Sequence, residues 1–276
     1  MKRRNLAVSI LLFILALFWL LVAIVPFGFM LLSSFKQSLE LMTAPIWALP
    51  QAPTLDNYRT VLENNFLRYL TNSIIVVTVS IALVLILSAM AAYIFARVPF
   101  RGNRIIFLLV IAGLIVPIHV TLIPVYLLTS RAGIYDSLYA LIGPYVAFSL
   151  PLSIFILTQF MRQIPREMEE AARIDGCGPM RAFFSIILPL SKAGLVTIAI
   201  FNAVTLWNEF VFAFVLTSSP GVRTLPLAIW DFQGEYSANI PMIMTVLTLS
   251  ALPLILAYSI FQEQLERGIM AGAIKG

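Results

Sequence analysis

The sequence has few charged residues, one cysteine and one histidine, and each shortage excludes a class of protein. Only 11% of its 276 residues are charged and 61% are hydrophobic, whereas a soluble domain has about 25% charged residues. This balance excludes an ordinary soluble domain and indicates that most of the chain lies in lipid. Cys177 has no partner for an internal disulfide. With His119 as the single histidine, no metal site of the His/Cys type is expected.

Motifs for nucleotide binding and covalent catalysis are also missing. No glycine is followed by lysine anywhere in the chain, so a Gly-x-x-x-x-Gly-Lys-Ser/Thr phosphate loop is absent. No nucleophile lies at a plausible spacing from a histidine. The net charge of +5 is small and does not indicate nucleic-acid binding. We therefore expect a chain that is not an enzyme and that binds no cofactor or metal itself.

Six stretches are long and apolar enough to cross a bilayer as helices, which takes about 20 residues each. They are residues 8–32, 72–96, 105–128, 139–161, 192–217 and 239–261. Only helices satisfy every backbone group of such a stretch in hydrocarbon. We therefore expect an all-α, polytopic membrane protein with six transmembrane helices and a single domain over residues 1–276. The first stretch is too long for the apolar segment of a signal peptide, so we expect it to be retained.

The distribution of basic residues predicts the orientation of these spans. Thirteen lysines and arginines fall on the side that holds both termini: Lys2, Arg3, Arg4, Arg97, Arg101, Arg104, Arg162, Arg166, Arg173, Arg181, Lys192, Arg267 and Lys275. Five fall on the other side: Lys36, Arg59, Arg68, Arg131 and Arg223. Loops rich in lysine and arginine stay in the cytoplasm, so both termini are expected there. Prolines inside the spans predict local kinks, at Pro117, Pro124, Pro144, Pro151 and Pro253.

The loop over residues 162–191 is the most charged stretch of the chain. Pro165 suits the first turn of a helix, and the acidic residues that follow it complement the helix dipole. Glu169 and Arg173 are four residues apart, in the order that favours an ion pair. Gly176 is placed to end the helix in a left-handed conformation. The pattern predicts a short amphipathic helix at the membrane surface.

A second short helix is expected after Gly178 and Pro179. Its apolar side would carry Phe183, Phe184, Ile187 and Leu188. The residues alone leave two uses of this helix pair open. It lies on the lipid headgroups, or it docks into the groove of a partner protein, for which Ala171 and Ala172 leave a smooth surface.

The same loop resembles a known family motif. Glu170-Ala171-Ala172-x-x-Asp175-Gly176, preceded by Ile164-Pro165-x-Glu167 and followed by Ile187-x-Pro189, resembles the EAA loop of ABC-importer permeases. Cys177 stands where a small residue such as alanine is common. The resemblance implies a type I importer permease fold, with a coupling helix seated in a cytoplasmic ATPase. It assigns that coupling to Glu167, Glu170, Ala171, Ala172, Asp175, Gly176 and Pro189.

Further segments resemble the carbohydrate branch of that family, which is maltose-transporter-like and depends on a binding protein. They are Ser34-Phe35-Lys36, Asn57-Tyr58, Ala91-Ala92-Tyr93, Trp207-Asn208-Glu209-Phe210 and the tail from Gly268 to Gly276. The resemblance implies import of a sugar, specifically a di- or oligosaccharide, across the cytoplasmic membrane of a prokaryote. It also implies a second homologous permease, an external solute-binding protein, and two ATPase subunits that bind the ATP and magnesium.

Two further groups of residues are candidates for function. Glu209 is the one carboxylate inside an expected span, and such groups usually face a cavity or a partner. Trp207, Asn208 and Glu209 are therefore expected to line the translocation path, although a structural role for Glu209 stays open. In the cytoplasmic tail 262–276, Gly272, Lys275 and Gly276 are expected to reach the ATPases, unless the chain end is loose.

Other functions compete with sugar import. The same architecture could carry glycerol phosphate, a polyamine or an amino acid. An ion-coupled secondary transporter is a further alternative, but it predicts broken helices with several charges inside the membrane. Only Glu209 meets that description in the sequence.

Overall fold

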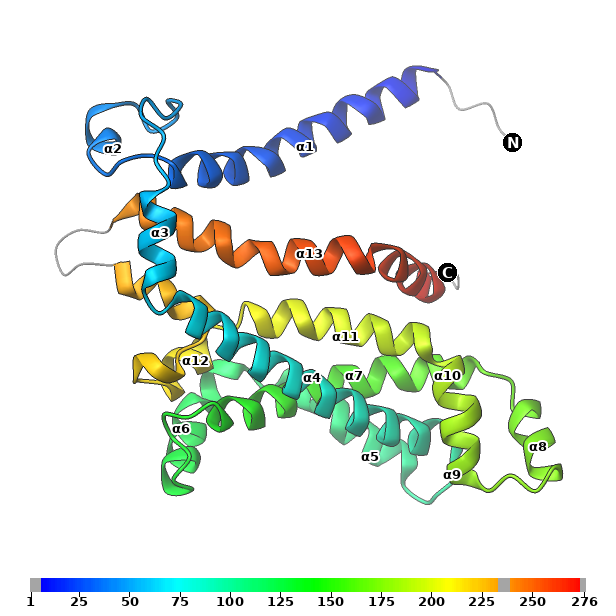
Figure 1. The fold of residues 1–276 in the computed structure, drawn as a ribbon. Coiled ribbons are helices and arrows are strands. Elements are labelled where there is room, and N and C mark those ends of the chain that lie inside the picture. Colours follow the sequence, from blue (N-terminus) through cyan, green and yellow to red (C-terminus); the bar gives the residue numbers. More distant parts are fainter. Residues whose placement is uncertain (1–5, 233–238, 274–276) are drawn as a thin grey trace. The chain divides into compact units, whose positions relative to one another are not determined.

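The structure, a computed structural model, describes residues 6–232 and 239–273, and every regular element in these ranges is helical (Figure 1). The all-α fold expected from the sequence is therefore confirmed. The chain divides into two compact units, one formed by residues 1–67 and 228–253 and the other by residues 68–227 and 254–276.

The first unit holds the N-terminal helix and a folded loop. It contains α1 (Leu6–Ser34), α2 (Glu40–Thr43), α3 (Asp56–Glu63) and the first part of α13 (Ile240–Ala273). After α1 the chain is held by Asn57, whose amide donates to the carbonyl oxygens of Ser34 and Lys36, each at 2.8 Å. The rings of Phe35 and Tyr58 also meet, with centroids 5.1 Å apart. Several residues that carry the family resemblance thus fix one loop.

The second unit contains the remaining helices. They are α4 (Phe66–Arg97), α5 (Asn103–Ala112), η1 (Gly113–Ile115), η2 (Ile118–Thr121), α6 (Leu122–Arg131), α7 (Tyr139–Gln163), α8 (Glu167–Ile174), α9 (Pro179–Ala182), the π-helix η3 (Phe183–Ile187), α10 (Leu188–Leu190), α11 (Lys192–Trp207), α12 (Val211–Leu216), η4 (Pro220–Val222) and η5 (Leu225–Phe232), which extends into the first unit.

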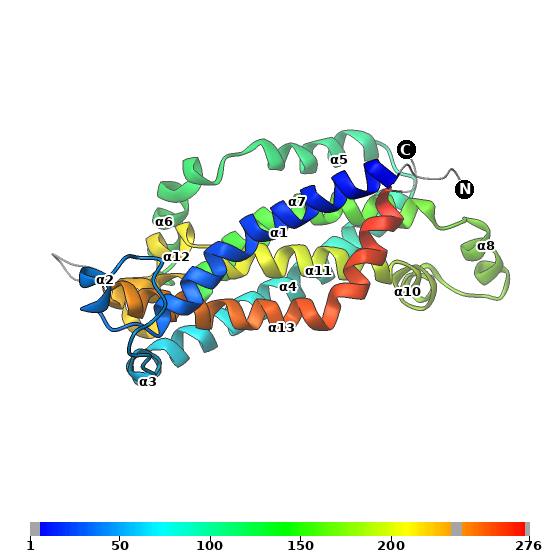
Figure 2. The same ribbon diagram turned by 90° about the horizontal axis from the view of Figure 1, so that it is seen from above.

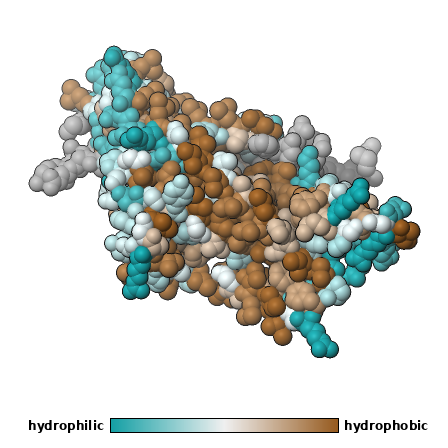
Figure 3. Space-filling view, turned by 60° about the horizontal axis from the view of Figure 1, so that its bottom comes forward, coloured by the Kyte–Doolittle hydropathy of each residue, from teal (hydrophilic) through white to brown (hydrophobic). Residues whose placement is uncertain are grey.

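Four helices in the described ranges are long and apolar enough to span a membrane, and up to six if each of two bent pairs counts as one span. The four are Val8–Ser34, Phe66–Arg97, Tyr139–Gln163 and Ile240–Ile260. On the face drawn in Figure 3, hydrophobic residues cover the middle and hydrophilic residues gather at the two ends. This distribution suits a chain whose solvent is the bilayer.

The stretch expected to span at 105–128 is bent rather than straight. The helix pair Asn103–Ile115 and Ile118–Arg131 turns by 90°. Pro117 lies in the break with an extended backbone (ψ 130°), and it has no N–H for the helical ladder. The kink expected at Pro117 is therefore confirmed, whereas Pro144, Pro151 and Pro253 lie inside continuous helices.

The expectation of one helix over 192–217 is wrong. Helix α11 ends at Trp207 after 16 residues, about 24 Å at 1.5 Å per residue, and α12 restarts at Val211. The bent pair in this region is instead Pro179–Leu190 with Lys192–Trp207, at 70°. The helix is interrupted between Trp207 and Val211 because the side chain of Glu209 accepts hydrogen bonds from the free backbone N–H groups at the start of α12.

The last helix is longer than the span expected at 239–261. Helix α13 continues to Ala273, so the backbone of Gly268 and Gly272 is helical and the C-terminal tail begins as an extension of the span. Lys275 and Gly276, which we expected to reach a partner, lie outside the described residues.

The core of the second unit joins α4, α7, η3 and α11. Its buried members are Ala89, Ala92, Leu157, Met161, Phe183, Ile187 and Ile198. At Gly194 of α11 an added Cβ would lie 2.8 Å from the ring of Phe160, so the absence of a side chain allows α11 to approach α7 closely. This packing fixes the base from which the charged loop 162–191 extends.

Candidate functional site

The charged loop has the helix–turn–helix form expected from its sequence. Helix α8 runs from Glu167 to Ile174, and Gly176 has a φ of +80°, in the left-handed region that favours glycine. The N–H of Gly176 donates to the carbonyl of Arg173, and the N–H of Cys177 donates to that of Ala172, at 3.0 and 2.8 Å. This pair of bonds is a Schellman motif, which terminates α8. In both views α8 stands at the end of the second unit, beyond α7 and α11 (Figures 1 and 2).

One face of α8 is anchored to the membrane helices by a buried ion pair. The Nε atom of Arg97, the last residue of α4, lies 3.1 Å from Oε1 of Glu169, and only 4% and 7% of these side chains are exposed. The contact is an ion pair without hydrogen-bond geometry. Arg97 also donates to the carbonyl oxygens of Met161 and Ile164, both at 2.6 Å. The guanidinium therefore ties the end of α4, the end of α7 and α8 together.

This ion pair replaces the one expected within α8. Glu169 and Arg173 have the right spacing for a surface pair, but Glu169 faces α4 instead and Arg173 is exposed. The reason is burial, because a carboxylate that leaves water needs an opposite charge beside it, and the buried guanidinium of Arg97 supplies that charge.

The opposite face of α8 is exposed. Glu167, Glu170, Ala171 and Ile174 recur at helical spacing, and all four are solvent-exposed, with Ile174 87% exposed. Asp175 and Gly176 at the end of the helix are exposed as well, and so is Pro189, whereas Ala172 is half-buried. Most of the residues assigned to coupling by the resemblance thus lie on a surface that packs against no other part of the described chain.

The second half of the loop packs partly as expected. Phe183 and Ile187 are buried in the core, and the ring of Phe183 lies 5.0 Å from that of Tyr93 in α4. The expectation that Phe184 shares this face is wrong, because Phe184 is exposed. Residues 183–187 form a π-helix, whose wider turn changes the direction of successive side chains.

Glu209 lies in the break between α11 and α12. Its carboxylate accepts hydrogen bonds from the backbone N–H groups of Phe212 and Ala213, at 2.8 and 3.2 Å. It also accepts one from the Tyr145 hydroxyl of α7, at 2.7 Å. A carboxylate placed within a membrane segment is thus satisfied by a helix N-terminus and a hydroxyl, both of which favour negative charge.

Trp207 and Asn208 directly precede Glu209 in the sequence but differ in their environment. Trp207 is buried at the end of α11, and Asn208 is exposed with its amide donating to the carbonyl of Val204 at 2.8 Å.

Sequence reasoning missed a polar contact at the opposite end of the second unit. The Asp136 carboxylate accepts hydrogen bonds from the backbone N–H groups of Ser218 and Ser219 at 2.7 and 2.8 Å, and from the Ser219 hydroxyl. Although burial acts to raise the pKa of Asp136, these bonds outweigh it and hold that pKa below its usual range. Asp136 has a φ of +56°, in the left-handed region that aspartate tolerates. The contact could not be predicted from local sequence, because Ser218 and Ser219 lie 82 and 83 residues further along the chain.

Comparisons with known proteins agree with this geometry. Residues 84–271 match the family described as binding-protein-dependent transport system inner membrane component. A putative ABC transporter permease protein of Caldicellulosiruptor sp. is 56% identical over 96% of each chain. The diacetylchitobiose uptake system permease protein of Streptomyces coelicolor is 34% identical over 99% of this chain and 90% of its own.

A solved structure supports the fold. The crystal structure of a bacterial ABC transporter involved in the import of the polysaccharide alginate includes a chain that superposes with a TM-score of 0.82, at 20% identity. The superposition covers 95% of this chain and 98% of that one. The type I importer permease fold expected from the sequence is thereby confirmed. The chain is a multi-pass membrane protein and belongs to the family of inner membrane components of binding-protein-dependent transport systems.

Proposed function

We propose that the chain is one of two permease subunits of an ATP-driven importer for a di- or oligosaccharide. A second, homologous permease completes the pathway, and two cytoplasmic ATPases, which bind the ATP and magnesium, supply the energy. An external binding protein delivers the sugar, in keeping with the family description.

The observation that carries this proposal is the division of α8 into two faces. One face is fixed to α4 and α7 through Glu169 and Arg97, and the other exposes Glu167, Glu170, Ala171 and Ile174. A helix that only rested on lipid headgroups would turn its apolar residues toward the membrane. Here the 87% exposed Ile174 shares a face with two glutamates, which suits a partner groove with mixed chemistry.

The same contacts give the loop the properties of a lever. Because Arg97 binds the carbonyl oxygens at the end of α7 and pairs with Glu169, α8 moves together with the ends of two spans. Closure of the ATPases would displace α8, and the displacement would reach α4 and α7 directly. Contacts that differ between two states shift the permease between inward and outward openings.

A sugar is the substrate class that the sequence relationships favour. A relative that is 34% identical over nearly the whole chain is named for diacetylchitobiose uptake. Trp207, Asn208 and Glu209 follow one another at the break after α11, and they supply an aromatic ring and hydrogen-bonding groups, the two kinds of group that sugar sites typically combine. The excess of basic residues on the α8 side supports a cytoplasmic location for that side and for both termini.

The proposal is tested by cross-linking and by transport. In a Cys177→Ala background, Ala171→Cys should cross-link to a co-expressed ATPase, whereas the exposed Arg101→Cys in the neighbouring loop should not. The complete complex, reconstituted with its binding protein, should take up a radiolabelled disaccharide when ATP is present on the ATPase side.

Two results would count against different parts of the proposal. Equal cross-linking from both positions would remove the coupling role of α8. Uptake of glycerol phosphate, a polyamine or an amino acid in place of any sugar would contradict the substrate class and leave the architecture intact.

A further inference from the structure

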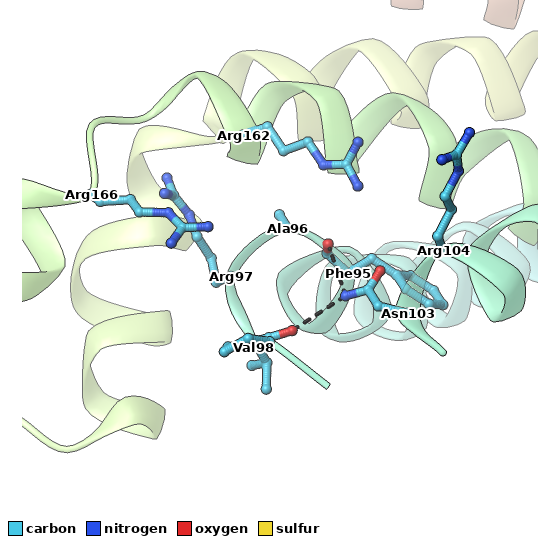
Figure 4. A pocket seen from close by; sticks show the side chains of 9 residues that line it. Phe95, Ala96, Arg97, Val98, Asn103, Arg104, Arg162 and Arg166 are labelled. Carbon is cyan, nitrogen blue, oxygen red and sulfur yellow. Dashed lines mark hydrogen bonds between the residues drawn. The ribbon is translucent and has the colours of Figure 1, made fainter. Parts of the chain in front are cut away.

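A polar pocket opens where three membrane helices end on the α8 side of the second unit. Its volume is about 390 Å³. It lies between the end of α4, the start of α5 and the end of α7, as Figure 4 shows. The lining residues are Phe95, Ala96, Arg97, Val98, Pro99, Asn103, Arg104, Arg162 and Arg166.

The lining carries four arginines and no acidic residue. Glu169 compensates Arg97, but the ion pairs of the described residues include none from Arg104, Arg162 or Arg166. All three are exposed, so their donor groups are open to a ligand from solution or membrane. The guanidinium of Arg162 is held over the ring of Phe107, 5.2 Å from its centroid. An excess of three positive charges thus surrounds a cavity large enough for an anionic group.

The frame of the pocket is held by the turn between α4 and α5. The Asn103 amide donates to the carbonyl oxygens of Phe95 and Val98, at 3.4 and 3.3 Å, as drawn in Figure 4. Gly102 has a φ of +88°, which allows the sharp entry into α5. The first residues of α5 therefore face the pocket from a fixed turn, and the positive end of this ten-residue helix adds to the charge of the arginines.

The surface beside the pocket identifies the kind of anion. Directly after Arg104, α5 exposes Ile105, Leu108 and Leu109, and this apolar strip runs into the membrane-spanning part of the helix. A free anion would use only the arginines, whereas an amphiphile would use both surfaces. Basic pockets between transmembrane helices at the cytoplasmic side suit anionic headgroups.

We propose that this pocket binds the phosphodiester headgroup of an anionic phospholipid, with the acyl chains against Ile105, Leu108 and Leu109 of α5. Arg104, Arg162 and Arg166 supply the ligand contacts. Arg97 holds the ends of α4 and α7 together at the side of the pocket. This inference rests on the proposed function in one respect, which is that the pocket faces the inner leaflet of the membrane. The contacts between the arginines and the lipid do not depend on whether the protein transports a sugar.

The test uses the full chain, purified in detergent, and native mass spectrometry of bound phosphatidylglycerol. The variant Arg104→Gln/Arg162→Gln/Arg166→Gln should lose at least about tenfold in the lipid-bound fraction, because three cations act together on one anion. The matched control Arg101→Gln/Arg181→Gln/Lys192→Gln removes the same charge from the same side outside the pocket, and it should bind like the wild type. Phosphatidylcholine should bind weakly to all three proteins.

Three results would overturn the proposal. Equal loss in both triple variants would mean that binding follows net charge rather than the pocket. If phosphatidylcholine bound as well as phosphatidylglycerol, the site would not select an anionic headgroup. Full displacement of the lipid by excess inorganic phosphate, with phosphate binding as tightly as the lipid, would assign the site to a free anion.

A measurement on the wild-type chain tests the site without any substitution, so misfolding of a variant cannot affect it. A photoactivatable phosphatidylglycerol with its reactive group near the phosphate should label residues 96–107 and 160–167. Labelling spread evenly over all segments of this membrane face would contradict a defined site. If the site is labelled while the complex fails to transport sugar, the proposed function fails and the lipid site stands.

Discussion

The Nε atom of Arg97 and the Oε1 atom of Glu169 lie 3.1 Å apart in a contact that is almost closed to solvent. One residue ends a membrane span and the other lies in the middle of α8, so the pair connects the spanning helices to the helix that we propose as the coupling element. The pair makes the position of α8 depend on the end of α4.

Removing one member of this pair should destabilise the protein. Glu169→Gln leaves the Arg97 guanidinium buried without a counter-charge, which typically costs about 3–5 kcal/mol. We expect a lower unfolding temperature of the solubilised chain and faster amide hydrogen exchange in residues 167–177. Glu170→Gln, one residue further on the exposed face, should leave both measurements unchanged.

A double substitution distinguishes charge burial from simple loss of a contact. In Arg97→Met/Glu169→Leu neither charge remains, so the unfolding temperature should recover most of the loss seen in Glu169→Gln. If the double variant is no more stable than the single one, relief of the buried charge does not exceed the loss of the hydrogen bonds from Arg97 to Met161 and Ile164, which contradicts a dominant cost of charge burial.

The turn after α8 gives a prediction about backbone conformation alone. Gly176 has a φ of +80° and an added Cβ would meet nothing within 4 Å, so Gly176→Ala introduces strain without a clash. The expected cost is about 1 kcal/mol, from the left-handed conformation. Gly178→Ala is the matched control, since Gly178 has a φ of −70° and equally open surroundings.

Hydrogen exchange at the end of α8 measures this effect. The amides of Gly176 and Cys177, which form the terminating bonds, should exchange faster in Gly176→Ala and at the wild-type rate in Gly178→Ala. Equal rates in both variants would show that the left-handed conformation costs nothing at this turn.

A close contact between α7 and α11 predicts destabilisation by a steric clash rather than by backbone strain. In Gly194→Ala the new Cβ would lie 2.8 Å from the ring of Phe160 and 3.1 Å from a methyl of Leu157. Overpacking of this kind costs about 1–3 kcal/mol. The control is Gly143→Ala in α7, where a Cβ meets nothing within 4 Å and the helix gains propensity.

Thermal unfolding of the two variants separates clash from propensity. Gly194→Ala should lower the unfolding temperature, and Gly143→Ala should leave it unchanged or raise it. Stabilisation by Gly194→Ala would mean that Phe160 moves aside freely and that α11 does not depend on the close approach.

The sequence was sufficient to predict elements that rest on local chemistry. Hydrophobic length indicated the spans, Pro117 indicated a kink, and Gly176 indicated the end of α8, because each signal acts within a few residues. The break at 208–210 was not predicted, since hydrophobicity continues from α11 into α12 and hides it. Glu209 was noticed as a carboxylate in a span, but the hydrogen bond that it accepts from Tyr145 could not be predicted, because Tyr145 lies 64 residues away in the chain.

The partner of Glu169 shows the same limit in the candidate site. Spacing along α8 favoured Arg173, whereas Arg97 is 72 residues earlier in the chain, at a distance that only the packing of α4 against the loop determines. The exposed residues of the motif, by contrast, could be recognised from the sequence because their pattern is local.

The contact between Asp136 and Ser219 predicts a dependence on pH. Burial raises the pKa of Asp136, but the Ser219 hydroxyl and two backbone N–H groups lower it by more, so the pKa lies below its usual value. The contact therefore contributes fully above the ordinary aspartate pKa of about 3.9 and is lost as the pH falls through the lower value of the folded protein. Amide exchange at Ser218 and Ser219 should stay slow from neutral pH down to that region.

Substitution of the hydroxyl tests the cause of this shift. Ser219→Ala removes the side-chain bond that most strongly lowers the pKa of Asp136, so the pKa should rise and the amides of residues 218 and 219 should loosen at a higher pH than in the wild type. Asp136→Asn should show faster exchange at neutral pH, with no acid transition, because the amide does not titrate. An unchanged transition in Ser219→Ala would assign the shift to the backbone bonds or to Arg223, whose positive charge also lowers the pKa. Those bonds hold the start of η4 beside the turn before α7, so acid should release this turn.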